Sequence, residues 1–335
     1  MKKFTYFLMA LFTLSLTMLT GCGNKDNNTI RVNEVTHSIF YAPLYVAINN
    51  GYFEEENIKI ELTNGGGSNV SMTALISGSA DVALLGPETA VYVAAEGKQD
   101  LPKVFGQLTK RDGSFLVGRQ DQENFDWQSL KGKEVLGGRP GGMPAMTLEY
   151  VIKQNGLTIG SGADQVNINY SIEFNNMTAA FTGGTGDFVT IFEPTASSIE
   201  REGKGHILTS VGSASGEVPF TAFMANDSYI TKNRDKIKGF LRAVMKGYDF
   251  IINSNIEQVI DSLKPSFEAF TREDIKNSVL SYTAIDAWVN TPVMTTESYN
   301  RLINIITEAG TLNTTVPFEK IVDNSIAIEV MNEKK

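Results

Sequence analysis

The sequence predicts an α/β protein of two lobes, and three observations support this fold class. The chain has 335 residues, which is long for one hydrophobic core and suits two units of about 150 residues each. Its hydrophobic fraction of 42% and charged fraction of 20% are typical of globular proteins. Strand-like and helical segments alternate in two successive series, which favours two sheets whose parallel strands are joined by helices.

The first series contains three predicted strands and three predicted helices. The strands are residues 29–35, 58–62 and 82–85, and the helices are residues 43–50, 68–78 and 88–95. The third strand is apolar throughout, as expected of a strand buried on both faces. Pro43 suits a first helical turn because its missing N–H would have no intrahelical partner there, and Ser68 or Asn69 can cap the second helix.

The second series and the C-terminal part continue the pattern. Further strands are expected at residues 104–109, 115–117, 134–136, 166–172, 187–192, 207–211 and 220–224, and further helices at 144–155 and from 193 onward. The strand at 220–224 is interpreted as the one that returns the chain. Three helices follow at residues 237–252, 273–282 and 296–309, and Thr231 is expected to cap the first of them.

Five loops follow predicted strands and precede predicted helices, which is where α/β sheets bind ligands. These loops are residues 37–41, 65–69, 86–88, 138–143 and 192–194. Glycine lets such a loop approach a ligand closely, and the free N–H groups of the next helical turn can donate to it. Any one loop is equally explained as a simple connection, but five of them favour a ligand crevice between two sheets.

The N-terminal segment has the pattern of an export signal. Two lysines precede an apolar run over residues 4–19, which is shorter than a membrane-spanning helix needs. The run ends in Leu-Thr-Gly-Cys at Cys22, the only cysteine, and this motif resembles the lipobox of bacterial lipoproteins. The resemblance implies a signal peptide at 1–21, acylation of Cys22, a polar tether over 22–28 and anchoring by two or more acyl chains. A signal peptide with an unrelated cysteine is the alternative.

Composition and motifs disfavour several function classes. A formal net charge of −9 without a run of Lys and Arg argues against nucleic-acid binding. The sequence has no G-x-S-x-G elbow, no phosphate-binding G-x-x-x-x-G-K-[ST] motif and only two histidines, His37 and His206. Two histidines and one acylated cysteine serve a zinc site poorly. We therefore expect a protein that is not an enzyme and that uses no cofactor or metal.

Several motifs resemble those of the solute-binding proteins of ABC transporters. They are Tyr-Ala-Pro-Leu-Tyr-Val-Ala at 41–47, Gly-Tyr-Phe at 51–53, Gly-Gly-Gly-Ser at 65–68, Ser-Gly-Ser-Ala-Asp-Val-Ala at 77–83 and Gly-Pro-Glu at 86–88. The likeness extends over residues 29–309. It is greatest for the group that binds aliphatic sulfonates, taurine, nitrate or thiamine-pyrimidine precursors.

This resemblance implies the two-lobed fold of type II periplasmic binding proteins, with a ligand cleft between the lobes. Lobe one would comprise residues 29–112 and 222–335, and lobe two residues 113–221, with chain crossings near 112–114 and 220–221. The resemblance also implies a monomer, held at the extracytoplasmic face of the membrane, that delivers a small solute to a permease and an ATPase. A membrane-tethered sensor with the same clamp is an alternative function.

An enzyme related to this family is a third possibility for function. The eukaryotic pyrimidine synthase of the family uses a cysteine-rich cluster. This chain has one cysteine, which disfavours that activity.

Family ligand positions can be carried over to the matching loops. The expected ligand-binding residues are Ser38, Phe40, Tyr41, Gly67, Ser68, Asn69 and Glu88 from lobe one, and Gly141, Gly142, Met143 and Glu193 from lobe two. Helix N-termini with serine hydroxyls suit an anion such as a sulfonate, whereas Glu88 and Glu193 oppose one. A carboxylate accepts N–H donors, and Phe40 and Tyr41 can stack on a flat ring.

We therefore favour a neutral or cationic nitrogenous solute, with a thiamine-pyrimidine precursor as the first candidate and a sulfonate or taurine as the second. Two questions stay open. Glu88 and Glu193 begin predicted helices, so they equally fit a role in stabilising helix N-termini without touching a ligand. Arg139 fits pairing with an acidic ligand group, pairing with Glu193 or a place in solvent.

Overall fold

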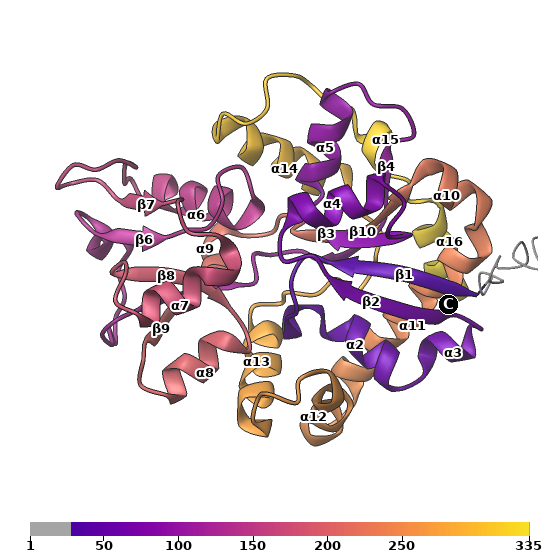
Figure 1. Ribbon diagram of the computed structural model, residues 1–335, viewed down its shortest axis with the longest axis horizontal. Coiled ribbons are helices and arrows are strands. Elements are labelled where there is room, and N and C mark those ends of the chain that lie inside the picture. The colour runs from indigo at the N-terminus through magenta and orange to yellow at the C-terminus, as the bar shows by residue number, and fades with distance from the viewer. Residues whose placement is uncertain (1–27, 335) are drawn as a thin grey trace, which may run out of the picture.

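The computed structural model describes residues 28–334 and contains two five-stranded mixed sheets flanked by helices (Figure 1). The first sheet has the order β2-β1-β3-β10-β4, from β1 (Thr29–Glu34), β2 (Lys59–Asn64), β3 (Val82–Leu85), β4 (Pro102–Thr109) and β10 (Thr221–Asn226). The second has the order β7-β6-β8-β5-β9, from β5 (Ser114–Gly118), β6 (Glu134–Leu136), β7 (Asn167–Asn169), β8 (Phe188–Phe192) and β9 (His206–Ser210). The predicted α/β class is confirmed. Below, lobe one is the first sheet with its helices, and lobe two is the second sheet with its helices.

Each lobe has its own set of helices. Lobe one carries η1 (Ile39–Tyr41), α2 (Ala42–Asn49), α3 (Tyr52–Glu55), α4 (Ser68–Ile76), α5 (Glu88–Ala95), α10 (Asp227–Lys232), α11 (Arg234–Asn253), α12 (Ile256–Leu263), η4 (Lys264–Ser266), α13 (Arg272–Ala284), α14 (Thr296–Glu308), α15 (Phe318–Ile321) and α16 (Ser325–Glu333). Lobe two carries η2 (Trp127–Leu130), α6 (Met143–Gln154), η3 (Phe174–Asn176), α7 (Met177–Thr182), α8 (Thr195–Arg201) and α9 (Val211–Ser215).

The predicted signal peptide at 1–21, Cys22 and all of the tether except Asn28 lie outside the described residues. In the part of the chain that the structure describes, no helix combines the length and apolar character needed to cross a bilayer.

Parallel pairing brings the predicted ligand loops to shared sheet edges. In the first sheet, β1 pairs parallel with both β2 and β3, as the first series predicts. In the second sheet, β6 pairs parallel with both β7 and β8. The loops that leave these strands therefore start at one edge of each sheet, and the helices α4, α5 and α6 begin there.

Two chain segments cross between the lobes and lie side by side. One joins β4 to β5, and the other joins α9 to β10. They are hydrogen-bonded to each other, because Val218 donates to the carbonyl of Lys110 at 2.9 Å and Phe220 donates to that of Thr109 at 3.2 Å. Phe40 packs over this crossing, where a Cβ on Gly113 would lie 2.6 Å from its ring.

The structure corrects several local predictions. Thr231 does not cap α11, because it lies inside the short helix α10, and α11 follows Asn233 without a side-chain cap. The cap of α4 is Gly67, so Ser68 and Asn69 are already inside that helix. The strand predicted over 166–172 is reduced to β7, because only its middle pairs with β6. The helices α12 and α16 were not predicted.

Replacing Gly247 by alanine should destabilise lobe one. Gly247 lies where α11 crosses α2, and a Cβ there would fall 2.1 Å from the carbonyl oxygen of Pro43, so the two helices would have to separate. We expect a loss of about 1–3 kcal/mol in the free energy of unfolding, measured by urea denaturation.

Gly239→Ala in the same helix is the matched control. Its Cβ would first meet Oε2 of Glu56 at 3.0 Å, the end of a flexible side chain, and alanine favours the helix by about 1 kcal/mol over glycine. Equal losses in the two variants would contradict the close helix contact at Gly247.

Candidate functional site

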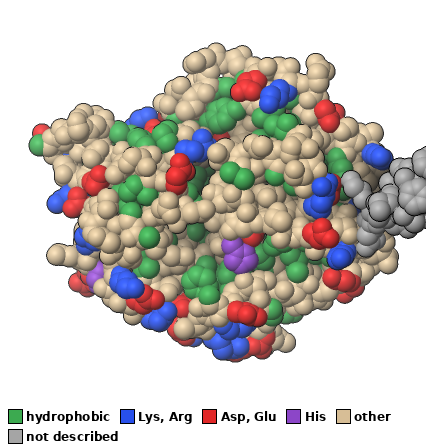
Figure 2. All heavy atoms as spheres, in the orientation of Figure 1, with side chains coloured by type: hydrophobic (Ala, Val, Ile, Leu, Met, Phe, Trp, Pro, Cys, Tyr) green, Lys and Arg blue, Asp and Glu red, His purple; other side chains and the backbone are tan. Residues whose placement is uncertain are grey.

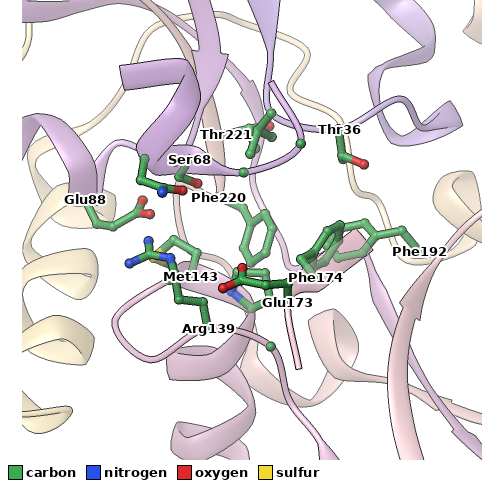
Figure 3. A pocket seen from close by; sticks show the side chains of 18 of the residues that line it. Thr36, Ser68, Glu88, Arg139, Met143, Glu173, Phe174, Phe192, Phe220 and Thr221 are labelled. Carbon is green, nitrogen blue, oxygen red and sulfur yellow. The ribbon is translucent and has the colours of Figure 1, made fainter. Parts of the chain in front are cut away.

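A cavity with a volume of about 70 Å³ lies between the two sheets (Figure 3). On the same scale, a single water molecule needs about 10–15 Å³. Its walls come from both lobes. Lobe one contributes Val35, Thr36, Tyr41, Gly66, Gly67, Ser68, Asn69, Gly86, Glu88 and Thr221, and lobe two contributes Gly138, Arg139, Gly142, Met143, Pro144, Glu173, Phe174 and Phe192. Phe220, in the crossing between α9 and β10, completes the wall. The site therefore has room for a small solute and would change shape if the lobes moved apart.

Glu88 is the buried charged group of this wall. It is the first residue of α5, its side chain is inaccessible to solvent, and neither carboxylate oxygen has a hydrogen-bond partner. Burial raises the pKa of Glu88 to about 7, although the Arg139 charge and nearby backbone N–H groups act in the opposite direction. These N–H groups lie near the carboxylate but do not meet hydrogen-bond geometry with either oxygen. A buried carboxyl group without a well-aligned donor is costly, so this group is ready to accept hydrogen bonds from a solute.

The turn between β3 and α5 makes this placement possible. The carboxylate of Glu88 folds back over Gly86, where a Cβ would lie 2.0 Å from Oε2. A side chain at residue 86 would therefore force the carboxylate out of its position.

Lobe two faces Glu88 with a positive group. The loop between β6 and α6 turns at Gly138 and Gly141, whose φ angles are 83° and 73°. Figure 3 shows the Arg139 guanidinium of this loop pointing toward the Glu88 carboxylate, with Met143 beside it. Arg139 donates to the carbonyl of Pro140 at 3.4 Å but forms no ion pair with Glu88 among the described residues. Opposite charges from two lobes thus face a shared space.

Aromatic side chains form the apolar part of the wall. The ring centroids of Phe174 and Phe192 are 5.7 Å apart, and those of Phe192 and Phe220 are 6.2 Å apart. Tyr41 is a buried residue of the same wall, and Glu173 is exposed at the rim. A flat or partly apolar solute suits such a surface.

The structure brings most of the predicted site residues to this cavity. Those on its wall are Tyr41, Gly67, Ser68, Asn69, Glu88, Gly142 and Met143. Four others have different contacts. Ser38 donates to the backbone carbonyl of Glu193 at 2.6 Å, Phe40 lies in the core, and the carbonyl of Gly141 accepts from Tyr92 at 3.2 Å.

The fourth, Glu193, is engaged within its own lobe. Its carboxylate accepts from the backbone N–H and the hydroxyl of Ser197, both at 2.8 Å, at the start of α8. It lines a neighbouring pocket with Thr36 and Phe192, and burial raises its pKa to about 7. These contacts match the helix-terminus role that the sequence left open for Glu193.

Other wall residues were not predicted. Phe220 and Thr221 were assigned only to a chain crossing. Because a crossing segment runs beside the cleft, its residues could have been predicted to contact a ligand. Glu173 and Phe174 gave no signal, since the preceding segment was predicted to be a longer strand. Among residues 28–334, no group of three or more His, Cys, Asp and Glu side chains is arranged to hold a metal ion.

The face drawn in Figure 2 shows no large patch of a single charge sign. Lys, Arg, Asp and Glu side chains are interspersed over that face rather than gathered by sign. Many of these groups are paired, as in the contacts of Arg242 with Glu56 and Lys238 with Glu333.

Comparisons with known proteins identify a family and several relatives. A family model described as NMT1/THI5 like matches residues 39–257. A candidate binding protein of Bacillus subtilis (strain 168), YtlA, is 40% identical over 317 residues, which is 94% of this chain and 94% of that protein.

Two further relatives are more distant. The 4-amino-5-hydroxymethyl-2-methylpyrimidine phosphate synthase of Aspergillus parasiticus is 25% identical over 262 residues, covering 71% of this chain and 75% of the synthase. The alkanesulfonate-binding protein SsuA from Xanthomonas axonopodis pv. citri, solved bound to MOPS, has a TM-score of 0.71 at 17% identity, over 89% of this chain and 99% of that chain. The latter likeness confirms the predicted periplasmic-binding-protein fold.

Replacing Glu88 by glutamine should stabilise the protein at alkaline pH. Because the native pKa of about 7 exceeds the ordinary value of 4.5, the native state binds this proton more tightly than the unfolded state. The free energy of unfolding is therefore reduced as pH rises from 4.5 through 7. The reduction is up to about 3 kcal/mol at higher pH, and glutamine removes it.

Urea unfolding at pH 4 and pH 8 measures this effect. The Glu88→Gln variant should gain stability over the unmodified protein at pH 8 and should gain none at pH 4. Glu96→Gln, at the exposed end of the same helix, should change neither value. A Glu88→Gln difference that is the same at both pH values would argue against a buried carboxyl group with a raised pKa.

Proposed function

The chain belongs to the NMT1/THI5-like family, and on this basis we propose that it captures a small nitrogen-bearing solute between its lobes for the permease of an ABC importer. The observation that carries the proposal is the solvent-inaccessible Glu88 carboxyl group, which lies on the wall of an interlobe cavity without a hydrogen-bond partner. The binding-protein name of the Bacillus relative and the alkanesulfonate-binding neighbour support transport as the class of function.

Binding rather than turnover fits the groups on the cavity wall. The wall presents the carboxyl groups of Glu88 and Glu173, the guanidinium of Arg139 and the hydroxyl groups of Ser68, Thr36 and Thr221. None of these hydroxyl groups is hydrogen-bonded to a histidine or carboxylate base among the described contacts. The related synthase is a more distant relative than the Bacillus protein, and we do not propose its activity for this chain.

The two facing charges define the chemistry of the solute. A solute that donates N–H groups to Glu88 and accepts a hydrogen bond from Arg139 would satisfy both lobes at once. Glu88 and Arg139 offset each other, and Glu173 adds a further carboxylate at the rim, so a neutral, zwitterionic or cationic solute suits the cavity better than a simple anion. A 4-aminopyrimidine has an amino donor and ring-nitrogen acceptors, and the phenylalanine rings would cover its flat faces.

A zwitterionic sulfonate such as taurine is the second candidate, and Arg139 is the observation that favours it. Its amine would face Glu88 and its sulfonate would face Arg139. Such a solute leaves the aromatic wall unused, which is why the aminopyrimidine is preferred.

Solute binding would favour closure of the lobes. The cavity wall is divided between the lobes, so a bound solute gains its full set of contacts only when the lobes are together. The two adjacent crossings leave one narrow connection about which the lobes can turn.

The cavity should bind 4-amino-5-hydroxymethyl-2-methylpyrimidine through Glu88. Isothermal titration calorimetry should show binding to the unmodified protein and a loss of about 10- to 100-fold in affinity for Glu88→Gln, as expected for a hydrogen bond to a charged group. Glu96→Gln is the control and should bind normally. Taurine binding without any aminopyrimidine binding would favour the second candidate, and equal affinities for Glu88→Gln and the control would refute the role of Glu88.

We further propose that Cys22 is acylated and holds the protein at the extracytoplasmic face of the membrane. In cells, the unmodified protein should sediment with membranes and partition into detergent. Cys22→Ser should leave the protein in the soluble fraction, because the thiol is the acceptor of the lipid. Retention of the Cys22→Ser protein in membranes would refute lipid anchoring at this residue.

A further inference from the structure

One hydroxyl group next to the cavity connects the two lobes. The Tyr92 hydroxyl, on α5 of lobe one, lies 3.2 Å from the carbonyl oxygen of Gly141 in lobe two. It also lies 2.9 Å from Oγ1 of Thr311, in its own lobe. Sδ of Met146, on α6, lies 3.6 Å from both hydroxyl groups. The phenol thus has a hydrogen-bond acceptor in each lobe.

These two acceptors compete when the Thr311 proton is engaged within lobe one. The Thr311 hydroxyl has one proton, and it can donate this proton to the carbonyl of Ile306 at 2.9 Å or to the Tyr92 oxygen at 2.9 Å. Donation to Ile306 leaves Oγ1 of Thr311 as an acceptor. The Tyr92 proton can then go either to Oγ1 of Thr311 or to the Gly141 carbonyl. Lobe separation would remove only the second acceptor, so the phenol would keep a hydrogen bond in either arrangement.

Both partners belong to elements that form the cavity wall. Tyr92 lies one helical turn after Glu88 on α5, so the two side chains share a face of that helix. Gly141 directly precedes Gly142 and Met143, which line the cavity from lobe two. Movement of the loop that carries Arg139 would therefore move the Gly141 carbonyl relative to Tyr92.

Other side-chain contacts also join the lobes. Arg201 of α8 pairs with Asp274 of α13 at 2.9 Å. Lys153 of α6 donates to the carbonyl of Glu308 on α14 at 3.4 Å.

A further contact lies at the crossing. The Tyr282 hydroxyl donates to the carbonyl of Gly113 at 3.1 Å and accepts from the backbone N–H of Glu193 at 2.9 Å. Because Gly113 is itself in a crossing segment, the bond to its carbonyl can persist while the lobes turn. The Tyr92 contact has no such tie to the crossing.

We propose that Tyr92 is a positioning residue that fastens the lobes together beside the cavity. Its hydroxyl exchanges the Thr311 acceptor of its own lobe for the Gly141 carbonyl of the other lobe when the cleft closes. This inference rests on the proposed clamp function but not on the identity of the solute.

Inter-lobe distances test the proposal in protein without added solute. Nitroxide labels on Lys98→Cys in lobe one and Lys131→Cys in lobe two, with Cys22 replaced by serine, report the separation by pulsed electron spin resonance. Both lysines are exposed, and no ion pair holds either of them among the described contacts. Short distances report closed lobes and long distances report open lobes. Tyr92→Phe should lower the ratio of short to long distances about 3- to 10-fold, because closure then loses the net contribution of one hydrogen bond.

Two further variants separate positioning from general stability. Tyr170→Phe also removes a tyrosine hydrogen bond, to Glu149, but within lobe two, and should leave the distance ratio unchanged. Thr311→Val removes the acceptor in lobe one and should not lower the ratio, because the Gly141 carbonyl remains. A ratio for Tyr92→Phe equal to that of the labelled parent would overturn the proposal, as would a fall of the same size in Thr311→Val.

These outcomes are distinct from failure of the solute proposal. If no tested solute binds but Tyr92→Phe still separates the lobes, the positioning role stands alone. If solute binds through Glu88 and Tyr92→Phe leaves the distances unchanged, the positioning role is wrong and the proposed function remains.

Discussion

The Glu88 carboxyl group is buried between two lobes without a well-aligned hydrogen-bond donor for either oxygen, and the proposed ligand chemistry depends on that constraint. Burial raises the pKa of Glu88, because protonation removes a charge that burial disfavours. Gly86 provides the space in which the carboxylate folds back, and Arg139 offers a compensating charge from the opposite lobe. A solute with N–H donors would supply the hydrogen-bond partners that the Glu88 carboxylate lacks in the protein.

The topology explains why this group can face the other lobe at all. Parallel pairing in each sheet gathers the loops after β1, β2 and β3 on one side and those after β6, β7 and β8 on the other. The strand β10 returns the chain to the first sheet in an antiparallel direction, which leaves the two crossings next to each other. A narrow connection of this kind allows closure while keeping both sets of loops aligned across the cavity.

Local sequence patterns predicted much of the fold but only part of the site. The strands predicted at 82–85 and 134–136 correspond to β3 and β6, and the loops after them drew attention to Glu88 and Met143, which lie on the cavity wall. The direction of a side chain depends on partners that periodicity does not reveal. Glu193 turns toward Ser197 in its own helix, and Phe174 reaches the cavity because β7 ends at Asn169, earlier than its apolar pattern indicates.

A ¹³C NMR titration of the Glu88 carboxyl carbon, assigned by comparison with Glu88→Gln, would examine this account most directly. Recorded without solute, the resonance should titrate near pH 7. Recorded with saturating aminopyrimidine, it should titrate well below that value, since N–H donors favour the carboxylate. A titration curve for Glu88 that bound solute leaves unmoved would contradict the claim that this carboxyl group holds the ligand.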